Sequence, residues 1–186
     1  MTLSSLAKEK EKLFSILKKD AFFKERILLS SGKESDYYFD ARRVTLKAEG
    51  VYLTAKIMLD NLKGINYDAV GGPTLGADAI LGAIGVLSFQ ANKPINTFII
   101  RKSPKSHGKK KQIEGPDVPQ GSRVVLIDDV ATTGKAFVES IDILTQAKIR
   151  IVSALCIIDR QEGAKETLAK YGCPLVSIFK AQEFLK

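Results

Sequence analysis

Two adjacent carboxylates, Asp128 and Asp129, follow an apolar strand predicted over Arg123–Ile127 and precede a turn of hydroxyl and glycine residues. That turn, Thr132-Thr133-Gly134, opens a segment with helical periodicity. Backbone N–H groups, hydroxyls and the positive end of a helix together suit a phosphate group. The carboxylates can accept hydrogen bonds from vicinal hydroxyls or lie near a metal ion. The pattern predicts a ligand that combines a phosphate with a sugar diol, against the alternative of an acidic turn with threonine caps.

Other common ligand sites are not supported by the sequence. It contains no G-x-x-x-x-G-K-[ST] phosphate loop, and Gly71–Gly76 lacks the spacing of a dinucleotide fingerprint. The two cysteines, Cys156 and Cys173, match no metal-binding spacing, and there is one histidine. A zinc site built from histidine and cysteine is therefore disfavoured, and we expect both cysteines to be reduced thiols in a cytoplasmic protein.

A basic run lies between the two halves of the chain. It holds six positive charges and the single histidine, His107, before the next acidic residue at Glu114; the cations are Arg101, Lys102, Lys105, Lys109, Lys110 and Lys111. A clustered run of this kind indicates an anionic partner more strongly than an evenly basic surface does. The partner could be a nucleic acid, an acidic membrane or a multiply phosphorylated small molecule, and a solvated loop without a ligand is equally compatible with the charge alone.

The length and composition are those of one globular domain, residues 1–186. The chain has 186 residues, of which 45% are hydrophobic and 27% charged, with a net charge of +8. No apolar run approaches the 18 or more residues that a transmembrane helix needs. The first residues lack the charged-then-apolar order of a signal peptide. We therefore expect a cytoplasmic protein without a membrane partner.

Helices and strands alternate along the chain. Helices are predicted over Lys8–Lys19, Lys47–Leu62, Leu75–Leu87, a segment marked by Phe137, Ile141 and Leu144, and Gly163–Tyr171. Strands are predicted over Asp68–Gly71, Thr97–Arg101, Arg123–Ile127, which Asp128-Asp129 closes, and Ile149–Ile158. Lys102–Pro119 has no periodicity and predicts a long loop. The alternation predicts an α/β fold whose parallel sheet is covered on both faces and binds its ligand at the carboxyl ends of the strands.

Four segments resemble one known family. Asp128–Gly134 resembles the phosphoribosyl-diphosphate-binding signature of the type I phosphoribosyltransferases. Within that family, Arg101–Gly108 resembles the mobile catalytic loop of orotate phosphoribosyltransferases, Ser30–Asp40 their N-terminal element, and Asp159–Gly163 their D-R-x-E turn on the base side. The resemblance spans roughly residues 25 to 165, and the four motifs occur in the family's order.

The resemblance implies a fold, a reaction and an assembly. The fold is the type I phosphoribosyltransferase fold, with an N-terminal helix and hood over about residues 1–45, a core over about 46–186 and a flexible catalytic loop over about 102–118. The reaction joins orotate to the ribose of 5-phosphoribosyl 1-diphosphate, giving orotidine 5′-phosphate and diphosphate, with Mg²⁺ as cofactor. The assembly is a homodimer in which Lys102 acts on the neighbouring subunit, with no nucleic-acid or membrane partner.

The resemblance also assigns roles to residues. The catalytic set is Lys102, Lys105, His107, Asp128 and Asp129. Phosphoribosyl diphosphate is bound by that set together with Arg101, Val130, Ala131, Thr132, Thr133, Gly134, Lys135 and Ala136. Orotate is bound by Thr132, Arg160, Tyr38 and Phe39, with the planar fork of Arg160 suited to its carboxylate. No direct protein ligand is assigned to Mg²⁺, which the substrate mainly holds.

The sequence departs from the family pattern in two places. Ser30 stands where many orotate enzymes have a lysine, and Gly72–Asp78 is a shorter loop without their Tyr-Lys pair. By analogy we expect a cis peptide between Thr74 and Leu75, and we assign no role to Lys109–Lys111. Two alternatives stay open: a phosphoribosyltransferase for another base, and a phosphoribosyl-diphosphate-sensing regulator that binds nucleic acid, which the +8 charge allows.

Overall fold

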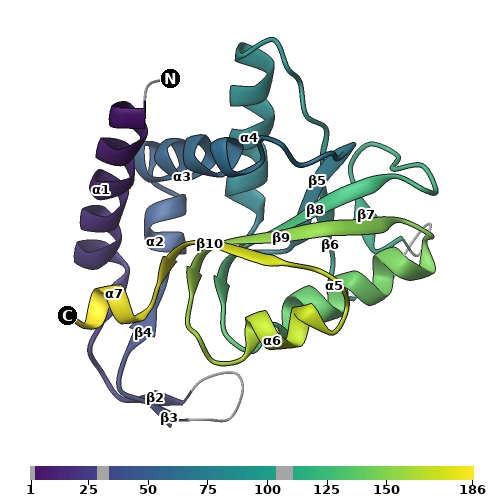
Figure 1. Cartoon of the computed structure of the whole chain (residues 1–186). Coiled ribbons are helices and arrows are strands. Elements are labelled where there is room, and N and C mark those ends of the chain that lie inside the picture. Colours follow the sequence, from purple (N-terminus) through teal and green to yellow (C-terminus); the bar gives the residue numbers. More distant parts are fainter. Residues whose placement is uncertain (1–2, 29–33, 104–110) are drawn as a thin grey trace.

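Six strands form the central sheet of the computed structural model, which describes residues 3–28, 34–103 and 111–186 (Figure 1). The strand order is β10-β9-β8-β5-β6-β7. All neighbouring pairs are parallel except β6 and β7. The strands are β5 (Ala69–Pro73), β6 (Thr97–Ile100), β7 (Ile113–Glu114), β8 (Arg123–Ala131), β9 (Arg150–Asp159) and β10 (Leu175–Lys180).

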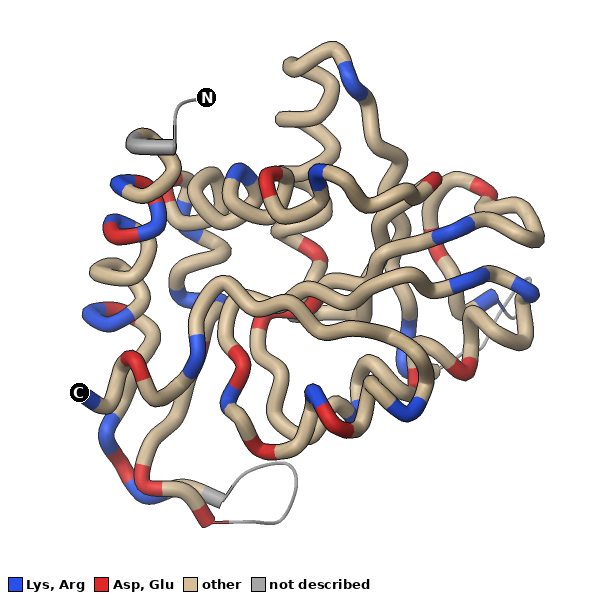
Figure 2. Tube along the Cα trace, in the orientation of Figure 1, with Lys and Arg blue, Asp and Glu red and all other residues tan. Residues whose placement is uncertain are grey.

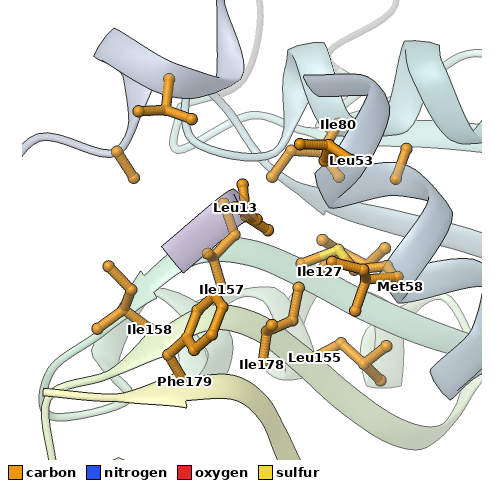
Figure 3. Close-up of a cluster of buried hydrophobic side chains, with 14 of the residues drawn as sticks. Leu13, Leu53, Met58, Ile80, Ile127, Leu155, Ile157, Ile158, Ile178 and Phe179 are labelled. Carbon is orange, nitrogen blue, oxygen red and sulfur yellow. The ribbon is translucent and has the colours of Figure 1, made fainter. Parts of the chain in front are cut away.

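Different helices cover the two faces of the sheet. One face packs against α1 (Leu3–Asp20), α3 (Ala48–Asn61) and α4 (Asp78–Gln90), and the other against α5 (Lys135–Gln146) and α6 (Ala164–Ala169) (Figure 1). Side chains along a strand alternate between the faces. In β8, Val125 and Ile127 therefore belong to the core cluster on the side of α1, α3 and α4, in which Figure 3 labels Ile127, and Val124 and Leu126 belong to the cluster on the other face.

The chain before the core forms a hood beside the carboxyl ends of the strands (Figure 1). After α1 it makes two small antiparallel pairs, one between β1 and β4 and one between β2 and β3, and then a single helical turn, α2. These elements are β1 (Phe22–Phe23), β2 (Ile27–Leu28), β3 (Glu34–Ser35), β4 (Tyr38–Phe39) and α2 (Arg42–Thr45). The C-terminal helix α7 (Gln182–Leu185) follows β10 and lies beside the hood.

An aromatic cluster fixes the hood to the core. The ring of Phe184 in α7 lies 5.0 Å from that of Phe39, 4.5 Å from that of Phe14 and 5.9 Å from that of Phe22, measured between ring centroids. Such rings supply large apolar area together with a preferred packing geometry. The cluster therefore holds β4, to which Phe39 belongs, against α1 and α7.

The sequence predicted the helices and central strands well, with shifted ends. Two predictions were wrong. Asp128-Asp129 does not close its strand, because β8 continues to Ala131 and pairs with β9 as far as Asp159. Lys102–Pro119 is not wholly irregular, because Ile113–Glu114 forms β7 and makes the sheet mixed rather than purely parallel. The short hood strands, β10 and α7 were not predicted.

The predicted helix over Leu75–Leu87 begins later than expected, at Asp78, because residues 74–77 form a turn. The Thr74–Leu75 peptide in that turn is cis, which confirms the expectation by analogy. Among the described residues, none of the helices combines the length and apolar character needed to span a bilayer.

An ion pair joins the beginnings of β5 and β8. The Asp68 carboxylate accepts a hydrogen bond from the Arg123 backbone N–H at 2.7 Å and another from its guanidinium at 3.1 Å. These hydrogen bonds lower the pKa of Asp68. A lowered pKa in the folded state means that the pair stabilises the fold above the ordinary carboxyl pKa, and that this contribution is lost as the pH falls through the folded-state value.

We therefore expect Asp68→Asn to lower the melting temperature at pH 7, with a difference from the unmodified protein that narrows below about pH 4. Thermal unfolding between pH 3 and 7 measures this difference. Asp142→Asn is the matched control, because Asp142 is exposed on α5. A gap for Asp68→Asn that stays constant down to pH 3 would contradict the expectation.

Candidate active site

A cavity of about 920 Å³ opens at the carboxyl ends of β5, β6 and β8. Three walls enclose it: the hood, the turn after β5, and the segment after β6. Its lining residues are Tyr38, Phe39, Asp40, Arg42, Pro73, Thr74, Leu75, Gly76, Asp78, Ile99, Arg101, Lys102, Ser103, Glu114, Asp128, Asp129, Val130 and Ala136. Eight of these belong to the predicted site: Tyr38, Phe39, Arg101, Lys102, Asp128, Asp129, Val130 and Ala136.

The acidic pair lies near the C-terminal end of β8. Pairing between β5 and β8 ends at Leu126, whereas β8 stays paired with β9 beyond it, so the end of β8 has a free side. Asp128 is 8% exposed, and its Oδ1 accepts a hydrogen bond from the Asp129 N–H at 2.9 Å. Burial raises the pKa of both carboxyls, and for Asp128 the charge of Asp129 raises it further. The pair is therefore a place where a cation or hydroxyl donors would be bound favourably.

The turn after β5 lies directly over these carboxylates. A Cβ atom at Gly76 would lie 2.3 Å from Oδ1 of Asp128 and 2.6 Å from Oδ1 of Asp129, which is too close for any side chain. Beside it, the Thr74 hydroxyl donates a hydrogen bond to Oδ2 of Asp78 at 2.8 Å. Glycine at position 76 lets the backbone of this turn form the roof over the acidic pair.

The predicted phosphate turn leads from β8 into α5. Gly134 has φ +84°, a left-handed conformation that favours glycine, and α5 begins at the next residue, Lys135. Among the described residues, no side chain caps the N-terminus of this helix. Its first backbone N–H groups therefore remain available to an anion. Of the predicted phosphate residues, Val130 and Ala136 line the cavity, and Ala131, Thr132, Thr133, Gly134 and Lys135 follow the same turn without lining it.

Arg101 and Lys102 form the basic wall of the cavity. Arg101 pairs with Glu114 of β7 at 3.7 Å, and its backbone oxygen accepts a hydrogen bond from the Gln112 amide at 3.2 Å. The Lys102 ammonium partly offsets the raised pKa of Asp128. Lys105 and His107, like Lys109 and Lys110, lie outside the described residues.

Tyr38 and Phe39 form an aromatic wall on the hood side. Phe39 is buried and also belongs to the aromatic cluster, so its ring serves the core and the cavity together. Tyr38 is partly exposed and stacks on Phe23, with ring centroids 6.5 Å apart. An aromatic wall at this position suits a flat heterocycle.

Arg160 lies behind that wall rather than in the cavity lining. It is 4% exposed, and its Nε donates to Glu162 at 2.8 Å while its Nη2 donates to Ser35 Oγ at 2.9 Å. The guanidinium also lies 4.5 Å from the centroid of the Tyr37 ring. Arg160 thus links the turn after β9 to the hood by side-chain contacts.

Ten lining residues had no role assigned from the sequence, and those with polar or charged side chains are Asp40, Arg42, Thr74, Asp78, Ser103 and Glu114. Asp40 and Arg42 directly follow the aromatic pair of β4, and that adjacency was the available signal. Arg42 Nε donates to Oδ1 of Asp40 at 3.2 Å. Glu114 reaches the cavity through β7, a strand too short to be recognised from its sequence.

Comparisons with known proteins give a consistent result. The phosphoribosyl transferase domain family matches residues 54–184. The chain is 41% identical over 184 residues to the orotate phosphoribosyltransferase of Aquifex aeolicus, covering 95% of this chain and 98% of that protein. It is 37% identical over 185 residues to the orotate phosphoribosyltransferase of Bradyrhizobium diazoefficiens, covering 98% and 99%.

Solved structures agree. Orotate phosphoribosyltransferase of Mycobacterium tuberculosis in complex with Fe(III) dicitrate superposes with a TM-score of 0.82 at 32% identity, covering 95% of this chain and 98% of that one. The same enzyme in complex with 5-phospho-alpha-D-ribosyl 1-diphosphate gives 0.79 at 28% identity, covering 96% and 99%.

The buried contacts of Arg160 generate a stability prediction. Glu162→Ala removes the carboxylate that accepts from Nε and leaves a buried guanidinium donor unpaired, so we expect a loss of about 1–3 kcal/mol in the free energy of unfolding. Urea unfolding at pH 7 measures it. Glu166→Ala, at an exposed position of the neighbouring α6, should change the free energy by no more than about 0.5 kcal/mol. Equal effects of the two substitutions would show that the Glu162 carboxylate does not stabilise the fold through the buried Arg160 guanidinium.

Proposed function

The chain belongs to the phosphoribosyl transferase family, and we propose that its reaction is orotate phosphoribosyl transfer. In this reaction orotate and 5-phosphoribosyl 1-diphosphate give orotidine 5′-phosphate and diphosphate, a step of pyrimidine (UMP) biosynthesis. The protein is thus a pentosyltransferase, as are its orotate-specific relatives.

One observation carries this proposal. A single cavity brings together the acidic pair Asp128 and Asp129, the basic wall and the aromatic wall. A substrate with a ribose diol, a leaving diphosphate and a flat base needs all three surfaces at once. A binding site for a simple phosphate or sugar would need fewer.

The basic wall serves the leaving group. As the bond between C1 and the diphosphate oxygen breaks, the ribose becomes oxocarbenium-like and negative charge gathers on the diphosphate. Arg101, which lines the cavity, stabilises that charge in its own site, and Lys102 does so in the site of the partner subunit. We assign the same role to Lys105 and His107 on the strength of the motif, and a loop closing here would exclude water that competes with the base for the cationic ribose.

The acidic pair and the turn after it hold the sugar. Asp128 and Asp129 accept hydrogen bonds from the ribose hydroxyls and stabilise the positive charge that develops on the ring. The backbone N–H groups of Thr132–Ala136, at the uncapped start of α5, cradle the 5′-phosphate. With the sugar held in this way, the reacting C1 would lie between the basic wall and the aromatic wall of the cavity.

The hood side holds the base. Tyr38 and Phe39 line the cavity and present their rings to orotate. We assign Thr132 to the edge of the base on the strength of the motif, since it is not among the lining residues. We assign the orotate carboxylate to Arg160 on the strength of the motif. In the structure this cation lies beside Tyr37, outside the cavity lining, and its side chain donates to Glu162 and Ser35. Its backbone N–H donates to the Ala131 carbonyl at 2.8 Å, which keeps it next to the phosphate turn.

A magnesium ion fits the residues of this site. Mg²⁺ prefers oxygen ligands and usually keeps several from water or substrate phosphates. Within the described residues, no group of three acidic, histidine or cysteine side chains could ligate a metal ion, whereas Asp128 and Asp129 offer buried carboxylates to one held mainly by the substrate. When bound, Mg²⁺ would neutralise the diphosphate and ease its departure.

The same proposal includes a homodimer in the cytoplasm. Large apolar side chains are exposed beside the cavity, and Leu46 and Leu75 border a second cavity of about 580 Å³ that adjoins the first. A partner subunit covering this face would bury them, and Lys102 would reach the partner's site. Cys156 and Cys173 are free and buried, which suits a reducing compartment.

The alternatives from the sequence are weaker. Basic residues occur along the whole described trace with acidic residues among them (Figure 2). The net charge of +8 therefore does not by itself indicate a nucleic-acid-binding surface. A purine substrate has no carboxylate for the buried cation Arg160 to meet.

The substrate assignment is tested by diphosphate release from phosphoribosyl diphosphate and Mg²⁺ with orotate, uracil, hypoxanthine, guanine or adenine offered separately. We expect release with orotate alone, at least about a hundredfold slower in Lys102→Ala because a leaving-group cation is lost. Arg160→Ala should selectively weaken the binding of orotate.

Release with another base would overturn the assignment of orotate as the substrate. Tight binding of phosphoribosyl diphosphate without release would favour the regulator, and strongly salt-dependent binding to nucleic acid would then be the next measurement.

The role of Lys102 across the dimer is tested by mixing two inactive variants, Lys102→Ala and Asp129→Asn. If Lys102 acts on the partner's site, a mixed dimer has one site with both changes and one intact site. Random reassociation should then restore about a quarter of the unmodified activity. Each variant alone is the control. Absence of any recovery, with mixed dimers verified by mass, would mean that Lys102 serves its own chain's cavity, which it lines in the structure.

A further inference from the structure

Arg42 is a cation of the main cavity to which no motif gives a role. It is the first residue of α2, directly after the hood strand β4 and Asp40. Its side chain is 47% exposed and lines both the main cavity and the adjoining second cavity. Neither its burial nor its packing explains an arginine at this point, since a half-exposed side chain adds little to the core.

Most of the Arg42 guanidinium is left for a ligand. A guanidinium has five N–H donors, and within the described residues the hydrogen bond of Arg42 is the one from Nε to Asp40. Arg42 also lies close enough to Asp129 for the two charges to interact. Its donors therefore stand at the mouth of the site that holds the ribose.

The cavity walls need such a cation on the hood side. The lining carries the carboxylates of Asp40, Asp78, Glu114, Asp128 and Asp129, against the cations Arg42, Arg101 and Lys102. Arg101 and Lys102 both follow β6, whereas Arg42 comes from the hood (Figure 1). A polyanionic group between these walls would meet cations from β6 on one side and from Arg42 on the other.

The position of Arg42 distinguishes the two phosphate-bearing ends of the substrate. Arg42 shares both cavities with Leu75 and Asp78, which belong to the turn after β5 and the start of α4. The second cavity contains no residue of the Thr132–Ala136 turn that cradles the 5′-phosphate. Arg42 therefore borders the turn after β5 in both cavities, whereas Ala136 of the phosphate turn shares with it the main cavity alone.

We propose that Arg42 binds the diphosphate of phosphoribosyl diphosphate from the hood side, opposite Arg101. The planar fork of arginine suits two phosphate oxygens at once, and the contact to Asp40 holds its plane in place. This inference rests on the proposed function for the identity of the substrate, but it concerns a binding residue that can be tested without turnover.

The neighbouring residue provides a matched control. Arg43 has the same charge and lies on the same helical turn, but its guanidinium lies over the ring of Phe23, 5.0 Å from the centroid. It borders the second cavity and not the main one. Removing Arg43 therefore changes the net charge and the hood surface as much as removing Arg42, without touching the proposed contact.

The test compares two ligands by calorimetry in Mg²⁺ on the full chain. Phosphoribosyl diphosphate carries the diphosphate, whereas orotidine 5′-phosphate has the 5′-phosphate, ribose and base without it. We expect Arg42→Ala to weaken binding of phosphoribosyl diphosphate about ten- to a hundredfold and that of orotidine 5′-phosphate less than about twofold. Arg42→Lys should recover part of the loss, and Arg43→Ala should bind both ligands normally.

Several results would overturn the proposal. Equal weakening of both ligands would mean that Arg42 acts by shaping the hood, and equal weakening by Arg43→Ala would mean a general charge effect. Unchanged binding of phosphoribosyl diphosphate in Arg42→Ala would exclude the contact. Sedimentation of each variant checks that the assembly is unaltered.

Failure of the proposed function has a different signature. An unmodified protein that binds phosphoribosyl diphosphate but neither converts orotate nor binds orotidine 5′-phosphate has another substrate, and ribose 5-phosphate then replaces orotidine 5′-phosphate as the diphosphate-free ligand. An unmodified protein that does not bind phosphoribosyl diphosphate overturns both proposals.

Discussion

The burial of two neighbouring carboxylates at the end of β8 is the constraint around which the site is organised. Burying acidic groups is unfavourable unless something compensates for their charge, and the raised pKa of Asp128 and Asp129 reflects that cost. The sheet creates the place for them, because β5 separates from β8 after Leu126 while β9 does not. Ligands of open α/β sheets bind at such points, where the chain crosses to opposite sides of the first strand. The glycine roof at Gly76 then leaves just enough room above the pair.

The hood completes a site that the sheet alone would leave open. Its aromatic cluster ties β1 and β4 to α7, and the buried contacts of Arg160 tie Ser35 and Tyr37 to the turn after β9. The contacts that stabilise the hood therefore also position the rings of Tyr38 and Phe39 in the cavity wall, so a substitution that weakens these contacts affects both.

The sequence was most informative where local and long-range demands agree. The apolar run before Asp128 had to be a buried strand, and the glycine and threonines after it had to begin a helix, so the acidic pair and its turn were predictable. The strand's continuation to Ala131 was not, because it depends on pairing with β9 rather than on side-chain pattern. β7 was not predicted for the same reason, because this strand of two residues is defined by its pairing with β6.

The placement of Arg160 and Arg42 shows a different limit. A motif predicted a functional arginine at 160 but not its burial behind Tyr37, because cation–ring contacts join residues more than a hundred positions apart. Arg42 lacked a motif altogether and is identified by the two cavities that it borders.

The charge of the protein and the charge of its cavity have opposite signs, and together they favour a particular form of the substrate. A net charge of +8 attracts polyanions over the long range and speeds their encounter. Among the described residues that line the cavity, carboxylates outnumber cations, so a bare polyanion would meet Asp128 and Asp129 unfavourably. A diphosphate that arrives with a divalent cation presents positive charge to the acidic pair and negative charge to Arg101 and Lys102. Under the proposed function, the acidic pair would thus disfavour the metal-free diphosphate, and selectivity for the metal-bound form would need no dedicated metal site among the described residues.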